Sequence, residues 1–184
     1  MIHNFNISNL LSILRLFSGI PLVICLHKIE ISNTYWWYSI CIIVFIVLSD
    51  ILDGFLARKF NIVTSLGKII DPVADKICLM CVLLYLIEVY HLPFLFFFIL
   101  LSIRDIILIS MTSYLAIYHD MVSQANTYGK LFIFITMIMI IFHIFHLNDY
   151  LSKILFIISN VFLIISMLVY IKNHIRNIRS YEHI

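Results

Sequence analysis

The sequence predicts an all-α membrane protein with six transmembrane helices, and two observations support this fold class. Of the 184 residues, 63% are hydrophobic and 12% are charged, whereas soluble domains are about 45–50% apolar and about 25% charged. The chain also alternates between long apolar stretches and short polar segments. We therefore expect an integral membrane protein with a single domain over residues 1–184.

Six stretches are long enough to cross a bilayer, because a spanning helix needs about 20 mostly apolar residues for about 30 Å of hydrocarbon. These stretches are residues 8–27, 35–57, 69–90, 93–118, 130–147 and 151–171. The chain has only four glycines and three prolines. The connections are consequently short, which favours packing of consecutive helices as antiparallel neighbours.

Basic residues in the connections predict the orientation, since Lys and Arg are retained on the cytoplasmic side. One set of connections contains most of them: Arg58, Lys59, Lys68, Lys130, Lys172, Arg176 and Arg179. The other set contains Lys28 and Lys153 and is followed by the aromatic run at 35–38, which suits the outer interface. Both termini are then cytoplasmic.

The charge pattern also bears on partners and on the C-terminal tail. The formal net charge is +2 and the basic residues form no stripe, so we expect no nucleic-acid partner. The basic tail from residue 172 onward either lies on anionic headgroups as a short helix or is a frayed, solvated end.

Four of the ten acidic residues lie in one short segment. Asp50 and Asp53 are three residues apart and Asp71 and Asp75 are four apart, so each pair projects from one face of a helix. We expect the two pairs to face one another across a contact between the second and third helices, at the cytoplasmic border. Because Pro72 restricts the preceding residue, Asp71 either caps the third helix or lies in a helix that begins earlier.

Carboxylates this close together repel one another, and a buried unpaired charge costs several kcal/mol. Mg²⁺ or Mn²⁺ would offset the repulsion, because carboxylate oxygens suit these ions. Two ions about 3.5–4 Å apart would stabilise the attacking and leaving oxygens of a phosphoryl displacement. Two alternatives are solvated helix caps and the ion pathway of a transporter, although a transport site is expected nearer the middle of the membrane.

The four aspartates belong to a longer pattern. It reads Asp50-x-x-Asp53-Gly54-x-x-Ala57-Arg58, then eight residues, then Gly67-x-x-x-Asp71-x-x-x-Asp75. This pattern resembles the signature of the CDP-alcohol phosphatidyltransferase family at every position. The segment NISNLLSILRLFSGIPL at 6–22 is similar to the usual opening of that family, and the plan of six spans covers essentially the whole chain.

The resemblance implies an enzyme of phospholipid biosynthesis that transfers a phosphatidyl group from CDP-diacylglycerol to a polar alcohol and releases CMP. It implies Mg²⁺ or Mn²⁺ as cofactor, with two ions bound. By the same resemblance Asp50, Asp53 and Asp71 would hold the metal against the pyrophosphate. Asp75 would complete the second metal site and act as general base.

The other signature positions would bind the CDP-lipid. Gly54 and Ala57 would let the cytidine nucleotide lie against the helix, with Arg58 near its phosphates, and Gly67 would open the contact on the facing helix. The resemblance further implies a homodimer. Since the cluster lies where the basic residues begin, we expect the active site to face the cytoplasm from the cell (inner) membrane.

Two further segments bear on the acceptor. SIRDIIL at 102–108 and TYGK at 127–130 resemble phosphatidylglycerophosphate synthases and cardiolipin synthases of the family. Arg104 and Lys130 are candidates for binding an anionic acceptor, although a structural Arg104–Asp105 ion pair and a positive-inside anchor at Lys130 are alternatives.

The same segments depart from the glycerophosphate enzymes at two places. Thr112 stands near the place of an expected second arginine, and Leu131 follows Lys130 where a threonine is usual. We expect glycerol 3-phosphate as acceptor, giving phosphatidylglycerophosphate, with phosphatidylglycerol giving cardiolipin as the alternative. His143, His146 and Asp149 have a loosely metal-like spacing, which we attribute to interfacial packing.

Overall fold

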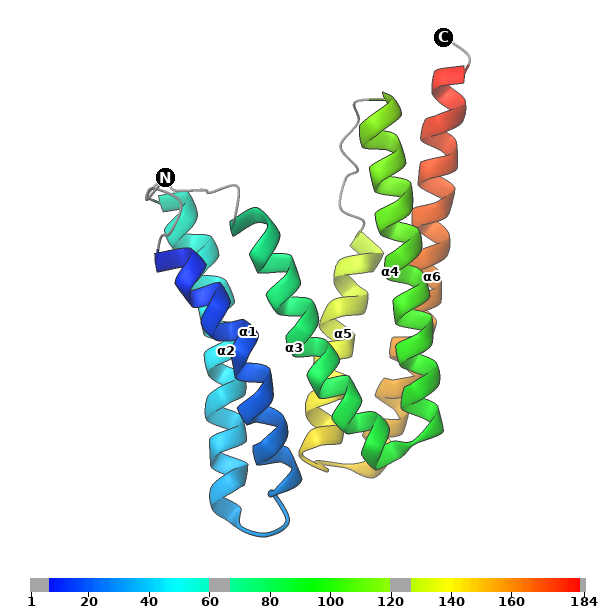
Figure 1. Ribbon diagram of the computed structural model, residues 1–184. Helices are drawn as coiled ribbons and strands as arrows, with labels where there is room; N and C mark the ends of the chain where they lie inside the picture. The colour runs from blue at the N-terminus through cyan, green and yellow to red at the C-terminus, as the bar shows by residue number, and fades with distance from the viewer. Residues whose placement is uncertain (1–6, 60–66, 120–126, 183–184) are drawn as a thin grey trace. The chain divides into compact units, whose positions relative to one another are not determined.

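The computed structural model describes residues 7–59, 67–119 and 127–182, and every regular element in these ranges is an α-helix. The helices are α1 (Ile7–His27), α2 (Asn33–Lys59), α3 (Gly67–Tyr90), α4 (Leu92–His119), α5 (Thr127–Ile144) and α6 (Asp149–Glu182). The expected all-α fold with six helices is confirmed. The helices form two compact units, Met1–Tyr90 with α1 to α3 and His91–Ile184 with α4 to α6 (Figure 1). The single domain expected from the sequence stays a prediction.

Five helices, α1, α2, α4, α5 and α6, are long and apolar enough to cross a membrane. Large apolar side chains on these helices are exposed, among them Phe17 at 59% and Phe134 at 63%. Such faces need no protein partner in lipid, because the hydrocarbon is as apolar as the side chains. The chain is therefore an integral membrane protein. α3 carries several charged side chains, and its crossing of the membrane stays a prediction, as does the orientation of the termini.

In the first unit α1 packs against both α2 and α3. Gly19 allows the close approach of α1 to α3, since a Cβ atom at this position would lie 3.0 Å from Cys81 Sγ. On the same side of α1, the Cys78 thiol donates a hydrogen bond to the Arg15 carbonyl oxygen at 3.0 Å. These contacts fix the position of α1, and so of Arg15, along α3.

In the second unit α5 packs along α6, and α4 also contacts α6. Its core is aromatic: Phe94, Phe97 and Phe132 are at most 2% exposed. Thr136 and Ser159 share a hydrogen bond of 2.8 Å between α5 and α6, which satisfies two buried hydroxyl groups in an apolar contact.

Three helix ends bear on the expectations from the sequence: the end of α5, the end of α6 and the start of α3. α5 ends at Ile144, before the expected residue 147, because His146 has a φ of 47° and the Leu147 N–H donates to the Phe142 carbonyl at 3.3 Å. This hydrogen bond closes the helix as in a Schellman motif. α6 continues to Glu182, so the basic tail is helical as far as that residue. α3 begins at Gly67, so Asp71 lies inside the helix and does not cap it.

Candidate metal and substrate site

The site begins with a polar stripe on α1. Asn9, Ser12 and Arg15 are three residues apart and are 2%, 0% and 0% exposed. A spacing of three places them on one helix face, and this face is buried in an otherwise apolar helix. A polar stripe of this kind requires hydrogen-bonding partners on the neighbouring helices.

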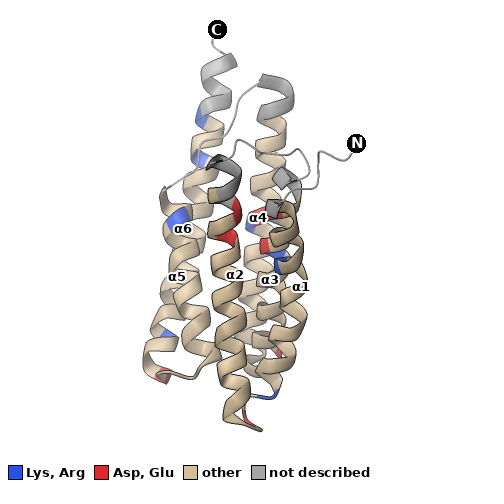
Figure 2. Cartoon of the chain, turned by 90° about the vertical axis from the view of Figure 1, so that its left-hand side faces the viewer, with Lys and Arg blue, Asp and Glu red and all other residues tan. Residues whose placement is uncertain are grey.

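Those partners are the aspartates of α2 and α3. Arg15 Nη1 donates to Asp50 Oδ1 at 2.6 Å and also to Asp75, and Arg15 Nη2 donates to Asp53. Ser12 Oγ lies 3.2 Å from Asp53 Oδ2 and also within hydrogen-bond distance of Asp71, and its single O–H can donate to either. All four carboxylates therefore meet at two side chains of α1. Figure 2 shows the charged segments of α1, α2 and α3 at one level of this unit.

The four carboxylates differ in accessibility. The side chain of Asp53 is 4% exposed, whereas those of Asp50 and Asp75 are 55% and 51% exposed. Asp71 is partly buried. Asp53 thus forms the inner wall of the cluster, while Asp50 and Asp75 present carboxylate oxygens that a ligand can reach.

The route by which the aspartates come together differs from the expected one. The sequence suggested direct packing of the second and third helices, but in the described residues each of these helices packs on α1, and the carboxylates meet through Arg15 and Ser12. Neither Arg15 nor Ser12 belongs to the candidate site residues predicted from the sequence. The signal was the spacing Asn9-x-x-Ser12-x-x-Arg15 in an apolar span, where an ionisable residue marks a functional site by default.

The remaining positions of the signature lie at the ends of the same two helices. Gly54, Ala57 and Arg58 belong to the C-terminal part of α2, and Gly67 is the first residue of α3. Their side chains lie outside the described part of the structure. Their expected contacts with the CDP-lipid stay predictions.

The donor chemistry of the cluster suits a hard divalent cation, since it consists of carboxylate oxygens and one hydroxyl. Among the described residues, however, no group of three or more His, Cys, Asp or Glu side chains is arranged to hold a metal ion. The hydrogen bonds explain this, because the Arg15 guanidinium stands between Asp50, Asp53 and Asp75. The oxygen ligands are of the type that divalent metals prefer, and the Arg15 guanidinium lies between the carboxylates of Asp50, Asp53 and Asp75.

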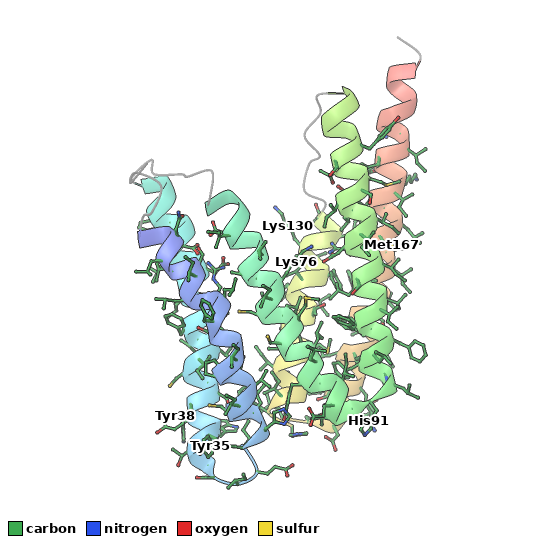
Figure 3. All side chains as sticks on the ribbon, in the orientation of Figure 1. Tyr35, Tyr38, Lys76, His91, Lys130 and Met167 are labelled. Carbon is green, nitrogen blue, oxygen red and sulfur yellow. The ribbon has the colours of Figure 1, made fainter. Side chains whose placement is uncertain are left out.

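The opposite end of this unit has a different character. Tyr35 and Tyr38 lie at the start of α2, away from the charged level (Figure 3), and their rings are in edge contact with centroids 6.2 Å apart. Aromatic side chains with polar tips suit the headgroup level of a membrane. The charged cluster thus lies toward the other end of α2.

The two candidate acceptor residues belong to the second unit. Arg104 Nη1 donates to Asp105 Oδ1 at 2.9 Å, and its guanidinium lies over the Phe132 ring at 5.2 Å. The structural ion pair therefore exists, and Arg104 is largely buried, with a side chain 13% exposed. Lys130 is exposed near the start of α5. Their binding of an acceptor stays a proposal.

Thr112 and His143, both singled out in the sequence, have local structural contacts. Thr112 donates to the Leu108 carbonyl at 2.6 Å and shares a hydrogen bond with the Tyr170 hydroxyl on α6. His143 is buried, with its Nδ1 2.8 Å from the Met139 carbonyl oxygen and its ring at the edge of Phe94. These contacts agree with packing at His143.

The sequence profile of the CDP-alcohol phosphatidyltransferase family matches residues 5–171. The chain belongs to this family. The matched range includes α1 with Ser12 and Arg15, and all four aspartates. Members of the family generally depend on a divalent metal, which agrees with the donor chemistry of the cluster.

Similar proteins include two enzymes named CDP-diacylglycerol–glycerol-3-phosphate 3-phosphatidyltransferase. That of Aquifex aeolicus (strain VF5) is 35% identical over 173 residues, which cover 90% of this chain and 93% of the relative. That of Wigglesworthia glossinidia brevipalpis is 37% identical over 116 residues, which cover 60% of each chain. A cardiolipin synthase (CMP-forming) / mitochondrial hydrolase fusion protein of Schizosaccharomyces pombe is 31% identical over 111 residues, 60% of this chain and 18% of the relative.

Proposed function

We propose that this family member transfers the phosphatidyl group of CDP-diacylglycerol to glycerol 3-phosphate, forming phosphatidylglycerophosphate and releasing CMP. The observation that carries the proposal is the convergence of Asp50, Asp53, Asp71 and Asp75 on Ser12 and Arg15 of α1. The names of the Aquifex and Wigglesworthia relatives support this acceptor.

In the proposed reaction, Asp75 takes the proton of the acceptor hydroxyl, and its half-exposed side chain suits this role. The oxygen then forms a bond to the lipid-side phosphorus, and the bond from that phosphorus to the bridging oxygen of CMP breaks. The electron pair of the broken bond leaves with CMP, where Arg58 would lie near the negative charge. The proton held by Asp75 passes to solvent or to the departing CMP, which restores the base.

Asp50, Asp53 and Asp71 would hold Mg²⁺ or Mn²⁺, with Asp75 completing the site of a second ion. When bound, the cations supply positive charge against the oxygens of the pyrophosphate. Gly54, Ala57 and Gly67 would leave room for the nucleotide beside the backbone, because they are small. We further propose a homodimer in the inner membrane with this cluster on the cytoplasmic side, so that the acyl chains stay in lipid while a polar acceptor enters from the cytoplasm.

Arg104 and Lys130 are proposed to bind the phosphate of the acceptor. Support comes from their positive charge and from the likeness of their segments to enzymes with such acceptors. The second candidate function is cardiolipin synthesis from phosphatidylglycerol, which the Schizosaccharomyces pombe relative favours. An ion or solute transporter is the alternative of a different class.

The test is release of CMP from CDP-diacylglycerol by the purified protein with Mg²⁺ or Mn²⁺, across a panel of acceptors. We expect rapid CMP release with glycerol 3-phosphate and much slower release with glycerol. Glycerol lacks the phosphate group that the side chains of Arg104 and Lys130 would bind. Phosphatidylglycerol, inositol phosphate and serine complete the panel.

Three outcomes would contradict parts of the proposal. If phosphatidylglycerol were the one acceptor of the panel that supports CMP release, the chain would be assigned to cardiolipin synthesis. Equal rates with glycerol and glycerol 3-phosphate would remove the proposed phosphate-binding role of Arg104 and Lys130. Ion flux in proteoliposomes without any CMP production would favour the transporter.

A further inference from the structure

Arg15 is an unusual component of an acidic cluster, because its side chain is 0% exposed while it contacts three carboxylates. Full burial of an arginine is costly unless the charge is paired and the N–H groups are hydrogen-bonded. The two Nη atoms meet this requirement through Asp50, Asp53 and Asp75. The buried Nε has no hydrogen-bond partner, so the side chain is incompletely satisfied where it lies.

The position of the guanidinium coincides with the position that a cation would take. It joins Asp50 and Asp53 of α2 to Asp75 of α3, and these are carboxylates that would hold a divalent ion. A guanidinium and a metal ion repel each other, and the Arg15 N–H groups occupy one oxygen each of Asp50, Asp53 and Asp75. Each cation therefore weakens the binding of the other to these carboxylates.

We propose that Arg15 is the resident cation of the aspartate cluster, which holds the carboxylates of α2 and α3 together in the absence of metal and competes with a divalent metal for Asp50, Asp53 and Asp75. The inference rests on the proposed function in one respect, namely that a divalent metal is the cofactor of this cluster. Arg15 is a positioning residue in this account, since it acts through the carboxylates.

Two consequences follow from competition. Without metal, loss of the Arg15 charge leaves the four carboxylates to repel one another, so the protein is less stable. With metal, the same loss removes a competitor, so the metal binds more tightly. A purely structural arginine would give the first effect without the second.

The experiment compares wild-type protein with Arg15→Gln, using Mn²⁺ alone as the probe. Bound Mn²⁺ is measured by electron paramagnetic resonance, and thermal unfolding is followed by tryptophan fluorescence with and without Mn²⁺. We expect the Kd for Mn²⁺ to fall by about tenfold or more. The Tm without metal should fall, and the rise in Tm on adding Mn²⁺ should exceed that of wild type.

Arg15→Lys serves as the second variant, because an ammonium keeps the charge and lacks the planar fork that bridges the carboxylates. Its Kd for Mn²⁺ should lie between those of wild type and Arg15→Gln. Arg176→Gln is the control, since it removes the charge of an exposed arginine on α6, in the second unit. Its affinity for Mn²⁺ should equal that of wild type.

The proposal is overturned if Arg15→Gln binds Mn²⁺ as weakly as wild type or more weakly. It is equally overturned if this variant cannot be recovered folded in saturating Mn²⁺, because the metal then does not replace the guanidinium. Failure of the proposed function is a separate observation: wild-type protein would release no CMP from CDP-diacylglycerol, while the order of Mn²⁺ affinities could still hold.

Discussion

Replacement of Asp75 by asparagine is expected to lower the rate of CMP release by about 10²–10⁴-fold or more, because the amide has the size of the carboxylate and cannot accept the proton. The fold should persist, since Asp75 is half exposed and Arg15 keeps its hydrogen bonds to Asp50 and Asp53. The measurements are the initial rate of CMP release and the Tm of the purified variant.

Asp149→Asn is the matched control. Asp149 is exposed in the first turn of α6, in the second unit, and the same substitution there should leave the rate of CMP release at the wild-type value. Full activity of Asp75→Asn would exclude Asp75 as the general base. A large fall in its Tm together with its rate would show that Asp75 acts on folding.

Removal of divalent cations is expected to abolish turnover. Four carboxylates and the pyrophosphate of CDP-diacylglycerol carry charge of one sign, and Arg15 is already bound to three of the carboxylates. Metal ions contribute several kcal/mol of transition-state stabilisation, which corresponds to a factor of about 10³ or more in rate. CMP release should therefore cease in EDTA and return when Mg²⁺ or Mn²⁺ is added in excess of the chelator.

The Tm of the chelated protein is the control for this experiment. We expect the protein to stay folded in EDTA, because Arg15 and Ser12 hold the carboxylates without metal. The metal content of the chelated sample is measured as well. If that sample contains no metal and still releases CMP at the same rate, the proposed mechanism is contradicted.

The helices could be predicted from the sequence because each is a long apolar run that ends at polar residues. Both ends of α1 and of α3 lie within two residues of the expected ends. α1 is Ile7–His27 where 8–27 was expected, and α3 is Gly67–Tyr90 where 69–90 was expected. α6 could not be bounded in this way, since hydropathy marks where lipid ends and a helix can continue beyond it. The backbone of α6 continues through polar residues to Glu182.

The proximity of the aspartates could also be predicted, because spacings of three and four place each pair on one face of a helix. Their partners are not part of the pattern from Asp50 to Asp75, which contains no residue of α1, and only the polar spacing of Asn9, Ser12 and Arg15 indicated them. Sequence distance conceals the contact: Arg15 and Asp75 are 60 residues apart. Only the packing of α1 against both α2 and α3 places Arg15 among the carboxylates.

If the aspartates of α2 and α3 share a divalent cation, the affinity for Mn²⁺ should differ between wild-type protein and Asp53→Asn. Asp53 forms the buried wall of the cluster, with a side chain 4% exposed. We expect wild-type protein to bind Mn²⁺ and the variant to bind it at least about tenfold more weakly, as for loss of a contact in a metal site. An unchanged affinity for Mn²⁺ in Asp53→Asn would contradict the account.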